Sequence, residues 1–499
     1  MKKLLTLILA MLMLLSFFAC RITSNRVTNS ENNNATNNNE NESTNNGNTD
    51  SDNNGLNVNK TICTSHNYVN NICSVCNCSL WNGEIDTSWY SVVNTEFNIS
   101  TAEEFAGFAK LVNDGTDFHD VTIKLCSHLD LNAKEWAPIG FLTGTFPNEI
   151  KQAFAGTFDG AGYNITNFVI TAVASSNSTN SVGLFGYSQG KIENIILDKF
   201  RIDVKMATSS LDGATLGDIY VGGISGYNSG IINNCKTNGL IEVTTASHNV
   251  IIGGVAGENE GNIKSCINNS NVSGEGCYIY GGGVVGRNWE IGSIEKCSSS
   301  GDISGIGTYD CHIGGLIGQI GNKTREKSVI KNCYSTGNIF ASSEQKCFAG
   351  GLVGFLYNGA EIYNSYALGN IIGESSLKNH YTNLNGNSNS YAGGLVGYID
   401  YAYYTRSLSV HDCWVTSGID LKTENGDGYA GFICGNYDEV LFSNCYYSNE
   451  VLLKADHIIT FGTPAGSEVF MNIAFYQNKM TAWDGNIWNL ADKTYPTLK

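Results

Sequence analysis

Between residues 181 and 445 the chain repeats short alternations of apolar and polar residues, separated by corners rich in glycine and asparagine. One copy begins YVGGISGYNSGIINNCKTN at Tyr220, and its segments YVGGIS, GIINNC and LIEVTT alternate with period two. Such alternation is typical of β-strands, while glycine and asparagine tolerate the left-handed backbone that tight corners need. The repeats nowhere show the spacing of a long helix. We therefore expect three short strands in each copy.

Two positions recur once in every copy of the repeat, even in copies that insertions have lengthened, and each position forms a column of equivalent residues. The second glycines of the glycine pairs are Gly223, Gly254, Gly283, Gly315, Gly351 and Gly394. The other column is Cys235, Cys266, Cys297, Cys333, Ser365, Cys413 and Cys445. One structural unit per copy explains this, and the fold class predicted is all-β, a right-handed parallel β-helix with three-stranded coils of about 30 residues. We expect the cysteines to point into the coil as buried thiols, with disulfides between coils as the alternative.

Composition agrees with stacked strands. The chain has 57 glycines but only 4 prolines, and central strands need the N–H groups that proline lacks. With 29 Lys and Arg against 46 Asp and Glu, the net charge is −17. That charge argues against binding nucleic acid or anionic lipid through a basic face.

The first 60 residues indicate export and tethering. In MKKLLTLILAMLMLLSFFAC, two lysines precede an apolar run too short to span a membrane, so residues 1–20 are predicted to be a signal peptide. Its end resembles a bacterial lipobox, although Phe17 stands where leucine is preferred, and this resemblance implies a lipid on Cys20 that binds the membrane. An ordinary signal cut nearby is the alternative. Residues 21–60 are rich in asparagine and too polar to fold, which predicts a disordered tether. The acidic residues among the asparagines favour a spacer over a prion-like segment.

Residues 61–84 contain a cluster of soft metal ligands. Cys63, His66, Cys73 and Cys76 follow the pattern C-x2-H-x6-C-x2-C, which suits a structural zinc ion with four protein ligands. The segment resembles small Cys/His knuckles near the start of bacterial surface proteins, with Asn77 where glycine is usual and Cys78 additional. Disulfides in an oxidising compartment are the alternative.

Residues 85–150 are predicted to form an entry cap. A helix should begin at Ser100 or Thr101 with a glutamate three residues later, and Phe105, Phe108 and Val112 give it one apolar face. A solenoid has an open end whose core and strand edges need covering, and such a helix could cover it. The repeats should then form a solenoid over residues 151–450, closed by a C-terminal cap over residues 451–499.

Further motifs carry a family resemblance. They are Trp136-Ala137-Pro138-Ile139-Gly140, Gly156-Thr157-Phe158-Asp159-Gly160 and the repeated GGxxG units. From about residue 95 to the end, the chain resembles GLUG-motif proteins, a group of bacterial surface and adhesin-like proteins that also includes non-catalytic parts of immunoglobulin-A metallopeptidases. Cys434 and Ser365 depart from the pattern. The resemblance implies a lipoprotein on the bacterial surface, on the outer membrane where there is one.

The functional hypothesis is a surface-anchored, non-catalytic binding or adhesion protein whose partner is an extracellular glycan or protein. The chain has no H-E-x-x-H motif, so peptidase activity does not carry over from the resemblance. Candidate binding residues are those of two tyrosine- and asparagine-rich loops, Tyr381, Asn383, Asn385, Tyr401, Tyr403 and Tyr404.

Two other functions stay open. One is a polysaccharide-degrading enzyme with carboxylates such as Asp302, Asp310 and Glu326, although these do not recur in register. The other is an architectural envelope protein whose loops bind nothing.

Overall fold

The structure is a computed structural model that describes residues 66–144, 148–174, 179–206, 217–290, 292–321, 327–357, 359–376, 389–400, 408–424, 426–436 and 441–499. The chain divides into two units, Met1–Asp50 and Ser51–Lys499, and every described residue belongs to the second. The predicted signal peptide, Cys20 and the tether therefore lie outside the described residues. Within the described ranges, no helix combines the length and the apolar character needed to cross a membrane.

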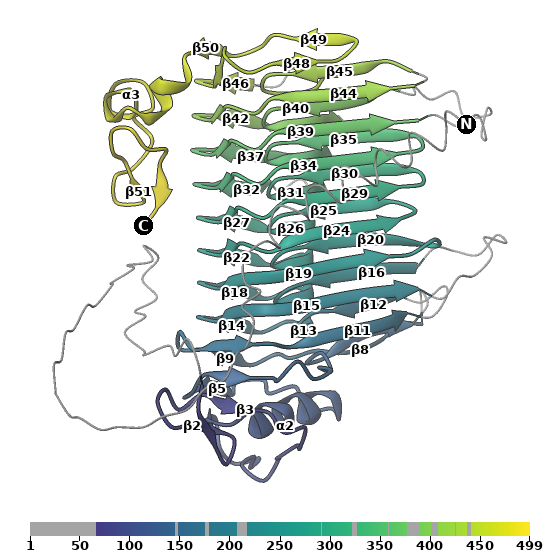
Figure 1. Ribbon diagram of the computed structural model, residues 1–499, viewed down its shortest axis with the longest axis vertical. Helices are drawn as coiled ribbons and strands as arrows, with labels where there is room; N and C mark the ends of the chain where they lie inside the picture. Colours follow the sequence, from purple (N-terminus) through teal and green to yellow (C-terminus); the bar gives the residue numbers. More distant parts are fainter. Residues whose placement is uncertain are drawn as a thin grey trace, which may run out of the picture. The chain divides into compact units, whose positions relative to one another are not determined.

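The central coils of the chain contribute to four sheets of mostly parallel strands, here called A to D. In one coil, β16 (Gly217–Gly222) lies in sheet D, β17 (Ser225–Asn228) in sheet C, β18 (Ile231–Asn233) in sheet B and β19 (Lys236–Thr244) in sheet A. Each pairs in parallel with its counterpart in the next coil, as the stacked arrows in Figure 1 show. The all-β fold with many-stranded parallel sheets is thus confirmed. The expected three strands per coil are wrong, because the glycine pair bends YVGGIS into two strands, β16 and β17.

The strands of sheet D, besides β16, are β7 (Phe141–Gly144), β8 (Ile150–Gln152), β12 (Thr179–Val182), β20 (His248–Gly253), β25 (Ile279–Gly282), β30 (Asp310–Gly314), β35 (Lys346–Gly350), β40 (Ser390–Gly393), β45 (Gly428–Gly431) and β49 (His457–Ile459). Those of sheet C, besides β17, are β13 (Phe185–Ser188), β21 (Ala256–Asn259), β26 (Val285–Trp289), β31 (Ile317–Gly321), β36 (Val353–Tyr357) and β41 (Val396–Asp400).

Sheet B contains, besides β18, the strands β4 (Glu96–Ile99), β5 (Thr122–Leu125), β9 (Thr157–Asp159), β14 (Lys191–Glu193), β22 (Asn262–Lys264), β27 (Ser293–Glu295), β32 (Ser328–Lys331), β37 (Ala360–Tyr363), β42 (Ser409–His411) and β46 (Leu441–Ser443).

Sheet A is the largest because most coils give it two short strands. Besides β19, it contains β1 (Tyr68–Val69), β2 (Ile72–Cys73), β3 (Ser79–Leu80), β6 (Leu129–Asp130), β10 (Asn164–Thr166), β11 (Val169–Ala174), β15 (Ile196–Met206), β23 (Ile267–Asn268), β24 (Asn271–Gly276), β28 (Ser298–Ser299), β29 (Ile303–Gly307), β33 (Tyr334–Ser335), β34 (Ile339–Ser343), β38 (Tyr366–Ala367), β39 (Ile371–Ser375), β43 (Trp414–Val415), β44 (Ile419–Thr423), β47 (Tyr446–Ser448), β48 (Leu453–Lys454) and β50 (Thr463–Ala465).

The glycine pair makes the bend between sheets D and C and also lets the coils stack. A Cβ on Gly282 would lie 2.1 Å from the carbonyl oxygen of Val285, three residues further on. A Cβ on Gly283 would lie 2.3 Å from the carbonyl oxygen of Gly315 in the next coil. Side chains cannot occupy such spaces, so the first glycine permits the bend and the second the close approach of coils. The pairs are neighbours from coil to coil, as predicted: the first glycines are paired in the order Gly222, Gly253, Gly282, Gly314, Gly350 and Gly393.

Aliphatic side chains at one position of sheet B fill the interior of the coils. Ile192, Ile232, Ile263, Ile294, Ile330 and Ile362 pair in sequence from coil to coil, and all are fully buried. Burying one such side chain contributes about 1.5–3 kcal/mol, so the column is a major source of stability that only stacked coils provide.

The cysteine column points inward, as predicted. Cys266 and its counterparts are buried, and each follows a residue with left-handed backbone, such as Ser265 with φ 54°. The N–H of Cys266 donates to Sγ of Cys297 at 3.5 Å. Ser365 takes the same place, and its Oγ accepts from the N–H of Cys333 at 3.1 Å. A small residue is what the corner requires, and the serine shows that a thiol is not essential there.

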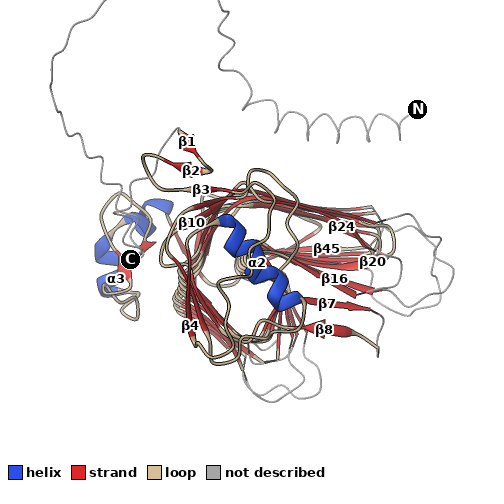
Figure 2. Cartoon of the chain, turned by 90° about the horizontal axis from the view of Figure 1, so that it is seen from below, coloured by secondary structure: helices blue, strands red, loops and turns tan. Residues whose placement is uncertain are grey.

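The helix predicted near the start is α2 (Ala102–Asn113), with Thr101 as N-cap and a complete capping box formed with Glu104. Its buried face contains Phe105, which stacks on Trp136 with ring centroids 4.8 Å apart. Phe108 on the same face stacks on Phe158 of sheet B at 5.7 Å. Figure 2 shows α2 lying across the ring of strands at this end of the coils.

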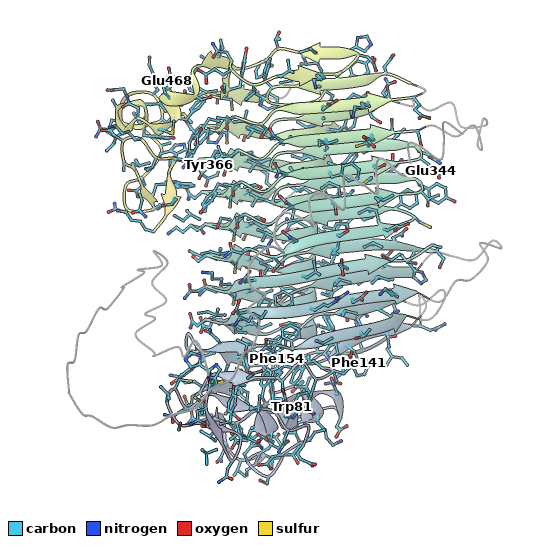
Figure 3. All side chains as sticks on the ribbon, in the orientation of Figure 1. Trp81, Phe141, Phe154, Glu344, Tyr366 and Glu468 are labelled. Atoms are coloured by element: carbon cyan, nitrogen blue, oxygen red, sulfur yellow. The ribbon has the colours of Figure 1, made fainter. Side chains whose placement is uncertain are left out.

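The last residues pack beside the coils. After β50 the chain forms a 3-10 helix, η1 (Ser467–Met471), the helix α3 (Ile473–Asn478) and the antiparallel pair β51 (Trp488–Asn489) and β52 (Thr497–Leu498). Phe470 stacks on Trp414 of sheet A at 4.7 Å, and Trp414 stacks on Tyr366 of the preceding coil at 4.2 Å. The indole N–H of Trp483 donates to the carbonyl oxygen of Asp412 at 2.9 Å. Figure 3 marks Tyr366 at this contact between the coils and the C-terminal segment.

We expect Gly282→Ala to destabilise the full chain strongly, by about 3 kcal/mol or more, because the new methyl group would overlap a backbone oxygen that cannot move alone. Gly485→Ala is the matched control, since a Cβ there meets nothing within 4 Å. Thermal unfolding followed by circular dichroism checks both variants. Equal melting temperatures for the two variants would contradict this account of the bend.

Candidate functional site

The predicted metal-binding segment brings three of its four ligand residues together. The donor atoms of His66, Cys73 and Cys76 all lie within 4.8 Å of one another, and Sγ of Cys76 lies 3.3 Å from Nδ1 of His66. Cys63 lies outside the described residues. Two sulfurs and one imidazole nitrogen form a soft donor set that suits zinc, so the described residues fit the predicted ion.

Local backbone geometry explains why the ligands converge. β1 and β2 form an antiparallel hairpin whose turn residues, Asn70 and Asn71, have φ values of 51° and 64°. Two left-handed residues in a row are what the favoured two-residue hairpin turn needs, and asparagine tolerates them. Asn77, at the position where the Cys/His knuckles that this segment resembles have glycine, has φ 58°, and its N–H donates to the carbonyl oxygen of Cys73 at 3.0 Å. The asparagine therefore performs the glycine's conformational role.

The two neighbouring thiols differ electrostatically. The pKa of Cys73 is lowered to about 5, chiefly by the backbone N–H of Cys76 and against the effect of its burial. Burial raises the pKa of Cys78 to about 12, and the hydroxyl of Tyr68 approaches its Sγ at 3.9 Å. Because metals bind thiolates, Cys73 is prepared to be a ligand, whereas Cys78 packs as an apolar residue.

The other predicted site residues are not described. Cys20 and the loop residues Tyr381, Asn383, Asn385, Tyr401, Tyr403 and Tyr404 lie outside the described residues. Of the carboxylates considered for an enzyme, Glu326 also lies outside them. Asp302 has an ordinary structural role, because its Oδ1 accepts the backbone N–H of Asn338 at 2.9 Å. Asp310 lies in a pocket that sequence reasoning did not identify.

This pocket belongs to a line of outward-facing side chains along the bend between sheets D and C, which we call the aromatic seam. The sheet D side consists of residues paired from coil to coil, namely Tyr220, Ile251, Tyr280, His312, Phe348, Tyr391, Tyr429 and His457. The sheet C side likewise consists of Tyr187, Tyr227, Glu258, Arg287, Gln319, Phe355 and Tyr398. The bend brings the sides together, as in the contact between Tyr391 and Tyr398 with centroids 4.5 Å apart.

Around Arg287, the side chains of the seam contact one another. Nε of Arg287 donates to the Glu258 carboxylate at 2.7 Å, and its guanidinium lies 5.5 Å from the ring centroid of Tyr280 and 5.4 Å from that of Trp289. The hydroxyl of Tyr220 donates to Asp218 at 2.9 Å. Burial raises the pKa of Glu258 to about 7, although Arg287 acts in the opposite direction. These side chains satisfy one another and form a structural ion cluster.

In the coils that follow, the seam opens into a cavity of about 290 Å³, which we call the seam pocket. Its lining residues are Asp310, His312, Lys346, Phe348, Phe355, Asn389, Tyr391, Tyr398 and Asp400. The ring of His312 stacks on Phe355 at 4.5 Å and meets the ring of Phe348 edge-on at 4.9 Å. Asn389 follows the undescribed residues 377–388, and Asp400 precedes 401–407.

The pocket keeps its imidazole neutral and disfavours charge on its carboxylates. Burial, assisted by Lys346, lowers the pKa of His312 to about 3, and its Nδ1 is buried without a hydrogen-bond partner. Burial also raises the pKa of Asp310 and that of Asp400, against the effect of Lys346. The cavity combines aromatic rings with several convergent polar groups, and a concave site that presents both is a candidate ligand site.

A signal for the seam was present in the repeats. The position two residues before each glycine pair reads Tyr, Ile, Tyr, His, Phe and Tyr from Tyr220 to Tyr391, and Tyr429 has the same place before the single Gly431. The position after the third glycine reads Tyr, Glu, Arg, Gln, Phe and Tyr from Tyr227 to Tyr398. Aromatic residues that recur in register next to a sharp bend indicate an outward line rich in aromatic side chains, which Ile251, Glu258, Arg287 and Gln319 interrupt.

Comparison with known proteins identifies the repeat. The GLUG motif family matches residues 278–304, 309–339 and 349–372, so the chain carries GLUG motifs. Halomucin from Haloquadratum walsbyi is 27% identical over 113 residues, which are 22% of this chain and 1% of that protein. The chain thus corresponds to a very small part of the length of this relative. A Bacteroides ovatus crystal structure, described as a "putative immunoglobulin A1 protease", aligns with 76% of this chain and 86% of its own, at 18% identity and a TM-score of 0.35.

We expect Arg287→Met to destabilise the chain by about 3 kcal/mol or more at pH 8, because it leaves the buried Glu258 carboxylate without its counter-charge. The pKa of Glu258 is already raised above its ordinary 4.5, and losing Arg287 raises it further. Such a group contributes stability below the unfolded pKa and loses it as pH rises through the folded pKa. The destabilisation should therefore be smaller at pH 5, where the variant's Glu258 is protonated. Urea unfolding at both pH values measures this.

Lys191→Met is the control for the same measurement. Lys191 pairs with Glu193 at 2.7 Å, but its side chain is 42% exposed, so its loss should cost less than about 1 kcal/mol at either pH. A pH-independent effect of Arg287→Met would show that the cluster is held by packing and not by charge.

Proposed function

We propose that this GLUG-repeat chain is a non-catalytic binding or adhesion protein displayed on the bacterial cell surface, with an extracellular glycan or protein as its partner. The observation that carries the proposal is the seam pocket, a concave aromatic site with carboxylate, amide and ammonium groups on the outside of a repetitive scaffold. Solenoids provide long surfaces for such contacts. The net charge of −17 favours a partner other than nucleic acid.

The remaining segments have supporting roles in this proposal. The signal peptide, residues 1–20, would leave a lipid on Cys20 that anchors the protein in the cell envelope, in the outer membrane where one exists, and residues 21–60 would act as a disordered tether. Residues 61–84 would hold a structural zinc ion, and α2 in the entry segment 85–150 would cap the open end of the coils. The solenoid of 151–450 would be right-handed, as nearly all parallel crossovers are, and 451–499 would complete it.

A polysaccharide-degrading enzyme is the second candidate. The observation in its favour is that Asp310 and Asp400 line the same pocket from different sheets, each with a pKa raised by burial. Glycoside hydrolysis needs two such carboxyl groups. The family model that matches the chain describes a repeat motif, and a fold of this type does not by itself imply catalysis. An architectural role without a ligand is the third reading.

The main test is display of the full chain on bacterial cells, followed by binding to arrays of glycans and matrix proteins. We expect cells carrying the chain to bind at least one array member above cells carrying an empty vector. Cys20→Ala should abolish labelling by a palmitate analogue and release the protein from the envelope. Labelling of the Cys20→Ala chain would refute the anchor, and cells that bind no array member would refute the binding function.

We expect the purified full chain to bind one Co²⁺ or Zn²⁺ ion, with cobalt giving the visible bands of a tetrahedral thiolate site. Cys73→Ser should abolish these bands, because it removes the thiolate whose pKa is lowered to about 5. Cys126→Ser is the control, since Cys126 is an exposed thiol that is not part of the ligand cluster. Intramolecular disulfides found by non-reducing mass mapping at Cys73 and Cys76 would instead support the alternative pairing.

A further inference from the structure

We propose that the seam pocket is a subsite for a neutral, polyhydroxylated sugar unit of a glycan chain, an assignment that rests on the binding function proposed above. The aromatic rings and polar groups that converge on the pocket carry this assignment. Nothing in the repeat motif itself specifies it, because the polar lining residues change from coil to coil.

Several polar groups of the pocket have no hydrogen-bond partner among the residues that the structure describes. Among the described residues, neither the ammonium group of Lys346 nor the carboxylate of Asp400 makes a hydrogen bond or a close ion pair. Nδ1 of His312, a residue only 6% exposed, is also unpartnered. Leaving such groups partly desolvated and unpaired is costly, so a ligand that supplies hydrogen bonds would recover this free energy.

The contrast with the neighbouring ion cluster is informative. Arg287, Glu258 and Asp218 occupy equivalent outward positions a few coils earlier, but there each charge has a partner within the protein. Charged side chains along the seam can therefore form ion pairs within the protein where their role is structural. Around the pocket, burial raises the pKa of Asp310 and of Asp400 and Lys346 acts in the opposite direction, but Lys346 forms no close ion pair with either among the described residues, which favours a ligand site there.

The charged residues that line the pocket indicate which class of sugar it would bind. Asp310 and Asp400 are two carboxylates, and Lys346 is the one cation among the lining residues. An anionic sugar would meet two like charges, and an amino sugar would meet the ammonium group, in a half-buried site where such repulsion is stronger than in bulk water. A neutral sugar hydroxyl can donate to either carboxylate and accept from the ammonium or from the Asn389 amide. Hydroxyl groups are therefore the ligand chemistry that uses every polar group of the pocket.

The aromatic lining suits a sugar ring that lies along the seam. Phe348 and Tyr391 are stacked with an interplanar angle of 2°, and Tyr391 and Tyr429 with an angle of 18°. Their faces are turned towards one another along the stack, so they present edges and hydroxyl groups outward. Ring edges carry partial positive charge and attract oxygen atoms. Neighbouring coils are about 4.8 Å apart, a spacing comparable to the length of one pyranose unit.

The test is isothermal titration calorimetry of the full chain with three sets of soluble oligosaccharides, which are neutral hexose oligomers, oligouronates and oligoglucosamines. We expect a neutral oligomer to bind best. Asp400→Asn and Tyr391→Phe should each weaken that binding about tenfold or more, because each removes a hydrogen-bonding group and keeps the shape. Tyr363→Phe is the control, since Tyr363 stacks on His411 at 5.0 Å in sheet B, away from the seam.

Variants that remove a charge from the pocket distinguish a site for neutral sugars from a site for charged ones. If the site were built for an anionic sugar, Asp400→Asn would strengthen oligouronate binding and Lys346→Gln would abolish it, and this result would overturn the assignment. Best binding of oligoglucosamine, or neutral binding that survives both pocket variants, would also overturn it and leave the wider binding function standing. New reducing ends that depend on Asp310 would support the sugar site and refute the non-catalytic function instead.

Discussion

The close approach of backbone to backbone at the glycine pair is the constraint on which the rest of the structure depends. At Gly282 a carbonyl oxygen occupies the space of a Cβ, and at Gly283 the carbonyl oxygen of the next coil does so. The contact at the first glycine allows the coil to bend at this place. The contact at the second glycine allows the backbone of one coil to pack directly against that of the next. The columns of isoleucine, of cysteine and of aromatic residues all inherit their register from this stacking.

Much of the fold could be predicted from this repetition. The spacing of the glycine and cysteine columns predicts vertical neighbours, and Gly253 and Gly282 are indeed paired. The capping box at Thr101 predicts a helix that the structure has. The number of strands per coil could not be predicted from the sequence, because the alternation of apolar and polar residues continues through the bend. Val221 and Ile224 both point into the core although the chain turns sharply between them. Only the clash distances at the glycines reveal that turn.

The candidate site was harder to predict for a physical reason. Tyrosine-rich loops such as 401–404 attract notice in a sequence, whereas the seam pocket combines Asp310 and Asp400, which lie on different sheets and in different coils. Its aromatic residues are visible as a repeated position, but their role depends on which side chains cover them. Arg287 and Phe355 occupy equivalent positions, yet one is enclosed by carboxylates and the other borders a cavity. The candidate metal ligands, in contrast, are local in sequence, and their spacing predicted the cluster that His66, Cys73 and Cys76 form.

The stack of Tyr366, Trp414 and Phe470 has a consequence for how the molecule comes apart. Linear repeat proteins tend to fray from their ends, since a terminal coil has a neighbour on one side only. Here Phe470 and Trp483 return to coils that precede the last ones, so they fasten the final turns of the chain to turns further inside. A terminal coil cannot unfold alone unless the contacts of Phe470 and Trp483 with the inner coils are broken first. That end of the stack should therefore melt cooperatively, as a block of several turns.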